Sequence, residues 1–188
     1  MLVAMRASAF LVALFCCSVA ARAGAEVRLP DLSVNAGVFL PSSSSVRRAV
    51  GDAWFNVGIS PSARRVGDRW TLEGDLEFIS GSGNGGDVLL APVTIGLARE
   101  FRPKDRGPVP FAAVRVGLAY MDYAVNTENG RQSAKRVEPT VNAEFALLLN
   151  DRTRLGLRYD LFPTVDGLRF DGLTVSLQYK AISFGRRD

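Results

Sequence analysis

Histidine is missing from the chain altogether. A Ser-His-Asp triad, a Cys-His pair and a histidine-ligated metal site each need an imidazole, so the sequence excludes all three. The serine run at residues 42–45 lacks the context of a nucleophile elbow and is expected to belong to a loop. We therefore predict no catalytic residue, no metal site and no cofactor, and we expect the protein not to be an enzyme.

Cysteine and long apolar runs are scarce. The two cysteines, Cys16 and Cys17, lie in residues 1–25, which have a basic start, an apolar stretch and small residues at the end. The apolar stretch is shorter than the ~20 residues that a membrane-spanning helix needs. We predict a secretory signal peptide that is cut before Glu26. The domain that follows, residues 26–188, would then have no disulfide and no thiol chemistry.

A strong excess of positive charge is also missing once that segment is removed. The loss of Arg6 and Arg22 lowers the net charge from +4 to +2. The other basic residues are scattered through the expected turns and do not gather on one face. This distribution is typical of solvated turn charges, so we expect no nucleic-acid partner.

The chain has, instead, a repeated alternation of apolar residues with small or polar ones. Residues 70–80 show it most clearly, because their apolar and acidic side chains fall on opposite faces of an extended strand. A helix cannot separate residues at a period of two. We predict strands at residues 33–40, 53–60, 70–80, 88–99, 111–122, 140–150, 154–162 and 173–180. Each is close to the ~9–11 residues of a tilted membrane strand, and an even number allows antiparallel closure. The fold class is therefore all-β, an eight-stranded up-and-down transmembrane β-barrel.

The two faces of the strands distinguish a membrane barrel from a soluble one. The polar face carries mid-strand glycines, which suit the narrow interior of an eight-stranded barrel. They are Gly37, Gly58, Gly96, Gly117 and Gly156. The other face is nearly uninterrupted aliphatic, with aromatic residues towards the strand ends, as in interfacial girdles. These are Trp70, Phe78, Phe111, Tyr120, Tyr159 and Tyr179. We predict that the apolar face contacts lipid; the alternative is a soluble periplasmic barrel whose apolar face lines a cavity for a lipid or other apolar ligand.

The chain resembles the small outer-membrane β-barrel family of Gram-negative bacteria, the OmpA/OmpX/OmpW-like group. The resemblance rests on the signal segment, the eight alternating segments and the last strand, residues 172–179, which is similar to the strand that the barrel-assembly machinery reads. Family chains typically stop at an aromatic residue, whereas residues 180–188 continue past Tyr179. The resemblance implies an outer-membrane location with both chain ends in the periplasm. It also implies membrane lipid, lipopolysaccharide and the assembly machinery as partners. Enzymes among such barrels depend on a catalytic histidine, which this chain lacks.

Charged residues lie on the face that we assign to the lumen. They are Glu73, Asp75, Glu77, Arg115, Glu144, Arg154, Arg158, Asp160 and Lys180. Buried charges need partners, and both signs occur in nearly equal number, so we predict a salt-bridged plug. We expect Arg115 to act as its latch, so that Arg115→Ala would open the lumen. Pro92 cannot donate to a strand ladder, and the OmpW-like resemblance permits an apolar molecule to leave sideways between the strands there.

The connections at residues 41–51, 81–87, 124–138 and 163–171 are predicted surface loops. The longest has Asn129 and Gly130 at its expected tip, with Lys135 and Arg136 nearby. It is the candidate for contact with a partner or with anionic lipopolysaccharide.

These observations predict a non-enzymatic integral outer-membrane barrel with an envelope structural or surface-interaction role, and at most slight permeation of small or hydrophobic solutes. The soluble ligand-binding barrel remains the alternative, with a transport pore proper behind both.

Overall fold

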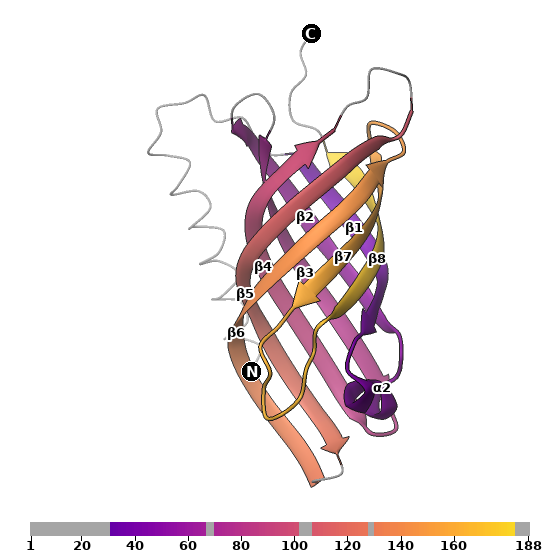
Figure 1. Cartoon of the computed structure of the whole chain (residues 1–188), viewed down its shortest axis with the longest axis vertical. Helices are drawn as coiled ribbons and strands as arrows, with labels where there is room; N and C mark the ends of the chain where they lie inside the picture. The colour runs from indigo at the N-terminus through magenta and orange to yellow at the C-terminus, as the bar shows by residue number, and fades with distance from the viewer. Residues whose placement is uncertain (1–30, 67–69, 102–106, 128–129, 183–188) are drawn as a thin grey trace.

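The chain folds into a closed β-barrel in which each strand pairs antiparallel with the next and β1 pairs with β8 (Figure 1). This computed structural model describes residues 31–66, 70–101, 107–127 and 130–182, so the predicted signal peptide lies outside the described residues. The strands are β1 (Asp31–Pro41), β2 (Trp54–Val66), β3 (Trp70–Gly83), β4 (Gly86–Glu100), β5 (Val109–Thr127), β6 (Gly130–Leu148), β7 (Thr153–Leu161) and β8 (Gly172–Ile182), and a short helix, α2 (Ser44–Val50), follows β1. The predicted eight-stranded up-and-down barrel is confirmed.

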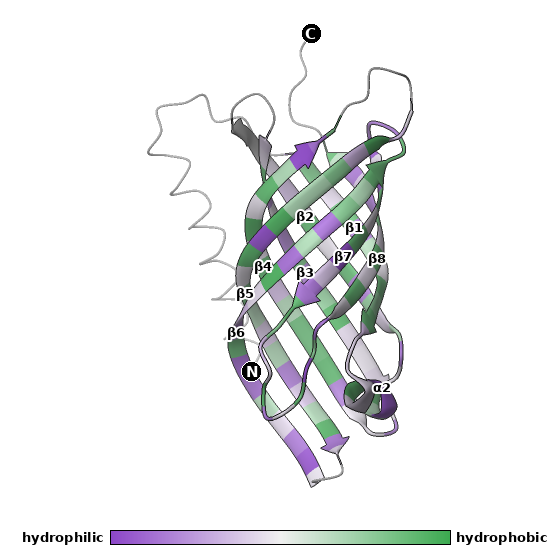
Figure 2. Cartoon of the chain, viewed as in Figure 1, coloured by the Kyte–Doolittle hydropathy of each residue, from purple (hydrophilic) through white to green (hydrophobic). Residues whose placement is uncertain are grey.

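The apolar side of the alternation faces outward in every strand. Figure 2 shows the alternation itself as green and purple bands along the strands. Exposed apolar side chains of this outer face include Val34, Phe55, Phe78, Ile95, Val116, Phe145, Leu157 and Leu177. Polar inward side chains such as Asn56, Glu77 and Arg115 are buried. The soluble alternative is therefore wrong for these strands, because the face that it needs around a cavity lies on the outside. In the described part of the chain, no helix is long and apolar enough to cross a membrane.

The two ends of the barrel differ in their connections. At one end, which we call the terminus end, β1 begins, β8 finishes, and β2, β4 and β6 lead into the next strand. The opposite end, the loop end, carries the connections that follow β1, β3, β5 and β7. In Figure 1 the terminus end is at the top and the loop end is at the bottom, where α2 lies.

The predicted loop at residues 124–138 is wrong. β5 and β6 remain paired as far as Thr127 and Gly130, and they form a hairpin that projects beyond the rest of the loop end (Figure 1). β6 therefore begins at Gly130, well before the predicted residue 140. The alternation fades here because the projecting hairpin extends beyond the apolar band. Its backbone hydrogen-bond ladder continues, but neither of its faces needs apolar side chains.

Two other predicted loops and the tail also contain regular structure. Residues 81–87 are nearly all strand, since Gly83 pairs with Gly86 across a tight turn. The segment 41–51 contains α2. β8 continues past Tyr179 to Ile182, and the last six residues of the tail lie outside the described ranges.

Interior glycines allow neighbouring strands to approach closely. A Cβ atom on Gly117 would lie 2.0 Å from the carbonyl oxygen of Val93 and 2.7 Å from the Cα atom of Thr94. Gly96 is equally confined, because its Cβ would lie 2.0 Å from the carbonyl oxygen of Val114. The obstacles are backbone atoms of the paired strand, which cannot turn aside as a side chain can. The close packing of β4 against β5 therefore requires glycine at positions 96 and 117.

We expect Gly117→Ala to lower the free energy of unfolding by about 1–3 kcal/mol, because the added methyl group overpacks the β4–β5 interface. Gly107→Ala is the matched control, since a Cβ atom there meets nothing within 4 Å. The measurement is urea unfolding in lipid vesicles, in which the folded fraction is monitored by its gel mobility without boiling. Equal midpoints for the two variants would contradict the close-approach argument.

Candidate functional site

The middle of the lumen is filled by an ionic network centred on Arg115. Its guanidinium group has no exposed surface and lies 2.8 Å from the carboxylate of Glu73, 3.1 Å from that of Asp75 and 2.8 Å from that of Glu144. The three carboxylates come from β3 and β6. Because β3 is not a neighbour of β5, these ion pairs tie separated parts of the wall together across the lumen.

Arg154 extends this network towards the terminus end. Its guanidinium lies 3.5 Å from Glu73 and 3.3 Å from Glu144, and it stacks 3.9 Å above the ring of Phe111. Phe111 is therefore in the lumen, where it is buried. Its predicted place in the outward girdle was wrong, because Phe111 and Arg115 are four residues apart in one strand and must share a face.

A second group of charges, centred on Arg158, lies beside the first. Arg158 donates to both oxygens of Glu77, and its Nε atom lies 2.9 Å from Asp160. Neutral side chains complete the bonding: the Thr174 hydroxyl donates to Asp160 at 3.0 Å, and the Asn56 amide donates to Glu77 at 2.9 Å. The structure thus brings eight of the nine predicted lumenal charges into these two groups.

The network contains more carboxylates than arginines, so arginine side chains alone do not balance its charge. Its arginines are Arg115, Arg154 and Arg158, and its carboxylates are Glu73, Asp75, Glu77, Glu144 and Asp160. Lys180, expected to join them, lies instead 3.3 Å from Asp31 at the terminus end. Amide and hydroxyl donors stabilise the excess carboxylates, among them Asn35, which donates to Glu77 at 3.2 Å. The plug is therefore a mixed hydrogen-bonded network.

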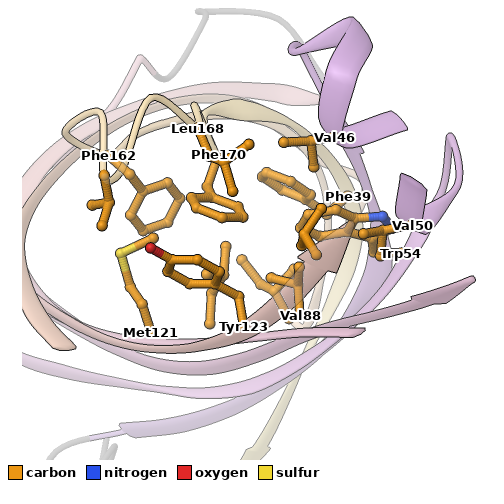
Figure 3. Close-up of a cluster of buried hydrophobic side chains, with 14 of the residues drawn as sticks. Phe39, Val46, Val50, Trp54, Val88, Met121, Tyr123, Phe162, Leu168 and Phe170 are labelled. Atoms are coloured by element: carbon orange, nitrogen blue, oxygen red, sulfur yellow. The ribbon is translucent and has the colours of Figure 1, made fainter. Parts of the chain in front are cut away.

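An apolar cluster closes the lumen at the loop end, which the alternation of the strands does not predict. We call it the cap; its side chains point towards one another inside the ring of strands (Figure 3). It consists of Phe39, Val46, Ala49, Val50, Trp54, Ile79, Val88, Leu90, Ala119, Met121, Tyr123, Val125, Phe162, Val165, Leu168 and Phe170. The signal that could have revealed it is the loss of alternation near the loop end, where inward positions also become apolar, as at Val88 and Leu90.

The connections at the loop end hold the cap in place. α2 contributes Val46 and Val50 and is tied to the β3–β4 turn by the amide of Gly85, which donates to the carbonyl of Ala49 at 2.9 Å. The ring of Trp54 packs 5.3 Å from that of Phe39, and its Nε1 atom donates to the Gly51 carbonyl at 3.0 Å. These contacts make α2 part of the closure and not a free surface helix.

The connection between β7 and β8 covers the other side of the cap. Val165 and Leu168 exchange two backbone hydrogen bonds, of 2.9 and 2.8 Å, around a turn at Asp166 and Gly167. The Tyr123 hydroxyl donates to the Asp166 carboxylate at 2.6 Å. The lumen therefore has a polar barrier in its middle and an apolar barrier at the loop end, one after the other.

The predicted surface residues lie on the projecting hairpin. Gly130 is at its end, whereas Asn129 lies outside the described residues. Lys135 lies 2.8 Å from Asp122, whose hydrogen bond and negative charge raise the pKa of the lysine ammonium. Arg136 lies 3.0 Å from Asp166. Both cations are thus on a strand and have acidic partners.

Pro92 interrupts the ladder, as its missing N–H predicted. Its side chain is buried on the lumen side. β3 and β4 are paired from Leu76–Val93 towards the terminus end and from Ile79–Leu90 towards the loop end, but not in between. The interruption lies where the ionic network gives way to the cap.

We expect Arg115→Ala to lower the free energy of unfolding by about 3–5 kcal/mol, because it leaves buried carboxylates without their cation. Lys135→Ala removes an exposed pair and should lower the free energy of unfolding far less, because solvent screens that pair. Urea unfolding in vesicles measures both. Similar losses for the two variants would show that the network does not stabilise the barrel.

Comparisons with known proteins agree with this architecture. The family model described as outer membrane protein beta-barrel domain matches residues 9–180. No curated protein matches the chain.

Among solved structures, Ail, the attachment invasion locus protein of Yersinia pestis, is 10% identical with a TM-score of 0.53, covering 79% of this chain and 95% of that chain. Neisserial surface protein A is 14% identical with a TM-score of 0.52, over 79% and 95%. The outer membrane enzyme PagL is 15% identical with a TM-score of 0.54, over 78% and 97%. At these identities the likeness is one of fold. With the family match over most of its length, the chain belongs to the outer membrane protein beta-barrel domain family, and its location is the outer membrane.

Proposed function

We propose that this protein is a non-enzymatic outer-membrane barrel with a closed lumen, which serves as an envelope structural or surface-interaction protein. The observation that carries the proposal is the arrangement of two barriers in series. A solute would have to separate the ion pairs of Arg115 and Arg158 and also displace the cap. Separating buried charges from their partners costs several kcal/mol, which opposes free conduction.

The projecting β5–β6 hairpin supports the surface-interaction part of the proposal. Lys135 and Arg136 keep 60% and 45% of their side-chain surface exposed although both are paired. Exposed ion pairs contribute only about 0–1 kcal/mol, so a phosphate group can compete for either cation. We propose anionic lipopolysaccharide as their contact on the cell surface.

The composition of the lumen supports a non-enzymatic role. The chain has no histidine to act as a base, and the lumenal carboxylates are engaged by arginine, amide and hydroxyl donors. In residues 31–66, 70–101, 107–127 and 130–182, no group of three or more Cys, Asp or Glu side chains is arranged to hold a metal ion. PagL is an enzyme by its description, but its likeness to this chain is one of fold.

A second candidate function is slight passage of apolar solutes. It rests on the interrupted β3–β4 ladder, which adjoins Ile79 and Leu90 of the cap. An apolar molecule that enters the cap would leave sideways through this interruption. A disulfide between Phe78→Cys and Ala91→Cys, which face each other across it, should abolish uptake of an apolar dye into vesicles. Uptake that is unchanged by the disulfide would rule out this route.

We expect the wild-type protein to give no sustained conductance in planar lipid bilayers. The cap adds a second barrier beyond the predicted Arg115 latch. We therefore expect Arg115→Ala alone to stay closed, in contrast to the expectation from the sequence. Combining this substitution with Arg158→Ala, Val165→Ser, Leu168→Ser and Phe170→Ser, so that both barriers are removed, should produce conductance. The current should be cation-selective, because the remaining lumenal carboxylates attract cations.

The outcomes separate the two barriers. Steady conductance by the wild type would refute the closed-lumen function. Conductance by Arg115→Ala alone would mean that the cap is no barrier. A closed combined variant that still shows the heat-dependent gel shift of a folded barrel would mean that the wall itself prevents passage.

A further inference from the structure

The outer wall carries a hollow of about 420 Å³ at the terminus end, across β3, β4 and β5. It exists because Ala112 is small: β3, β4 and β5 present Trp70, Arg99 and Ala112 side by side, and Phe145 of β6 follows. Its apolar lining includes Ile95, Leu97, Val114 and Val116. The hollow is therefore an apolar trough that runs from the rim into the lipid-facing band.

The side chain of Arg99 lies at the rim of this trough. The guanidinium of Arg99 lies 5.6 Å from the centre of the Trp70 ring and 5.0 Å from that of Phe101. Alternation puts Arg99 on the lipid-facing side of β4 and its neighbour Glu100 on the opposite side. Within the described ranges, Arg99 contacts these two rings and forms no ion pair with a carboxylate. Among the described residues, no carboxylate therefore competes with an anion from the surroundings for this guanidinium.

The neighbouring groups match the parts of a phospholipid. Tryptophan at a membrane interface lies at the level of the headgroups, and arginine beside it can bond a phosphodiester through two parallel N–H groups. Below them, Leu97 and Val114 offer an apolar surface along which an acyl chain can lie. The terminus end is the periplasmic side by the family resemblance, and the periplasmic leaflet of an outer membrane consists of phospholipid.

We infer that this hollow is a binding site for one anionic phospholipid, with the headgroup phosphate on Arg99 and an acyl chain in the trough beside Ala112. An anionic headgroup is favoured over a zwitterionic one because the zwitterion brings its own cation to the phosphate. The site lies on the outer wall and is separate from the lumen, so it adds lipid selection to the proposed role of the barrel.

The two tryptophans of the chain make the site measurable. Trp54 is buried in the cap and Trp70 is 42% exposed at the hollow, so Trp54→Phe leaves fluorescence from the site alone. The protein is reconstituted into phosphatidylcholine vesicles with a small fraction of phosphatidylglycerol brominated on its acyl chains. Bromine quenches tryptophan on contact. Brominated phosphatidylcholine at the same fraction gives the reference.

We expect brominated phosphatidylglycerol to be enriched about fivefold at Trp70, the factor for one basic residue near an anionic lipid surface. Arg99→Gln should abolish the enrichment, and Ala112→Leu should reduce it by filling the trough. Arg152→Gln is the matched control: Arg152 is also at the terminus end beside an aromatic residue, 3.5 Å from the Tyr179 hydroxyl, but does not line the hollow.

Folding of every variant is checked by its heat-dependent gel shift. Equal quenching by the two brominated lipids in the Trp54→Phe protein would overturn the inference, as would enrichment that survives Arg99→Gln. Loss of enrichment in Arg152→Gln to the same extent would also overturn it, because the effect would then come from general charge at the rim.

Discussion

An eight-stranded barrel has so little room inside that every inward charge must be bonded by a side chain from elsewhere in the wall. Arg115 satisfies this constraint with carboxylates from β3 and β6. The glycines of the polar face follow from the same shortage of space. A Cβ atom on Gly58 would lie 2.6 Å from Cγ of Glu77, and one on Gly156 would lie 2.9 Å from Oε1 of Glu144. The long side chains of Glu77 and Glu144 fit because the residues beside them are glycines, which have no side chain.

The lumen changes its chemistry along its length while the strands keep one geometry. Inward positions are charged in the middle and apolar near the loop end, where α2 and the β7–β8 connection cover them (Figure 3). The two barriers are sensitive to different mutations. The polar barrier is weakened when one partner of a buried ion pair is removed, and the apolar barrier is weakened when a large side chain is replaced by a small one. The outer wall shows a related pairing at Arg99 and Trp70, where a charge and an apolar trough meet at the membrane rim.

Much of this could be predicted from single residues and their spacing. Alternation assigned Leu157 to lipid and Arg158 to the lumen, and both assignments hold. Alternation is expected only where one face of a strand contacts lipid. The β5–β6 hairpin extends beyond the membrane, so its polar sequence resembles a loop although the two strands are paired. Phe111 lies in the lumen and not in the predicted girdle, because its even spacing from Arg115 decides its face and its aromatic character does not. The cap cannot be predicted from alternation, because alternation describes one strand at a time and does not show where apolar residues of several strands meet.

By itself, the sequence determined the fold class, the two faces of each strand and the residues of the ionic network, because side-chain direction in a strand follows from a local period of two. The tertiary structure alone decided which charges meet. Glu73 and Arg154 are 81 residues apart, and their contact depends on the stagger of strands around the closed barrel, which no local pattern encodes. It also decided that the loop end is sealed, since that requires α2 and the β7–β8 connection to fold over apolar side chains from five strands.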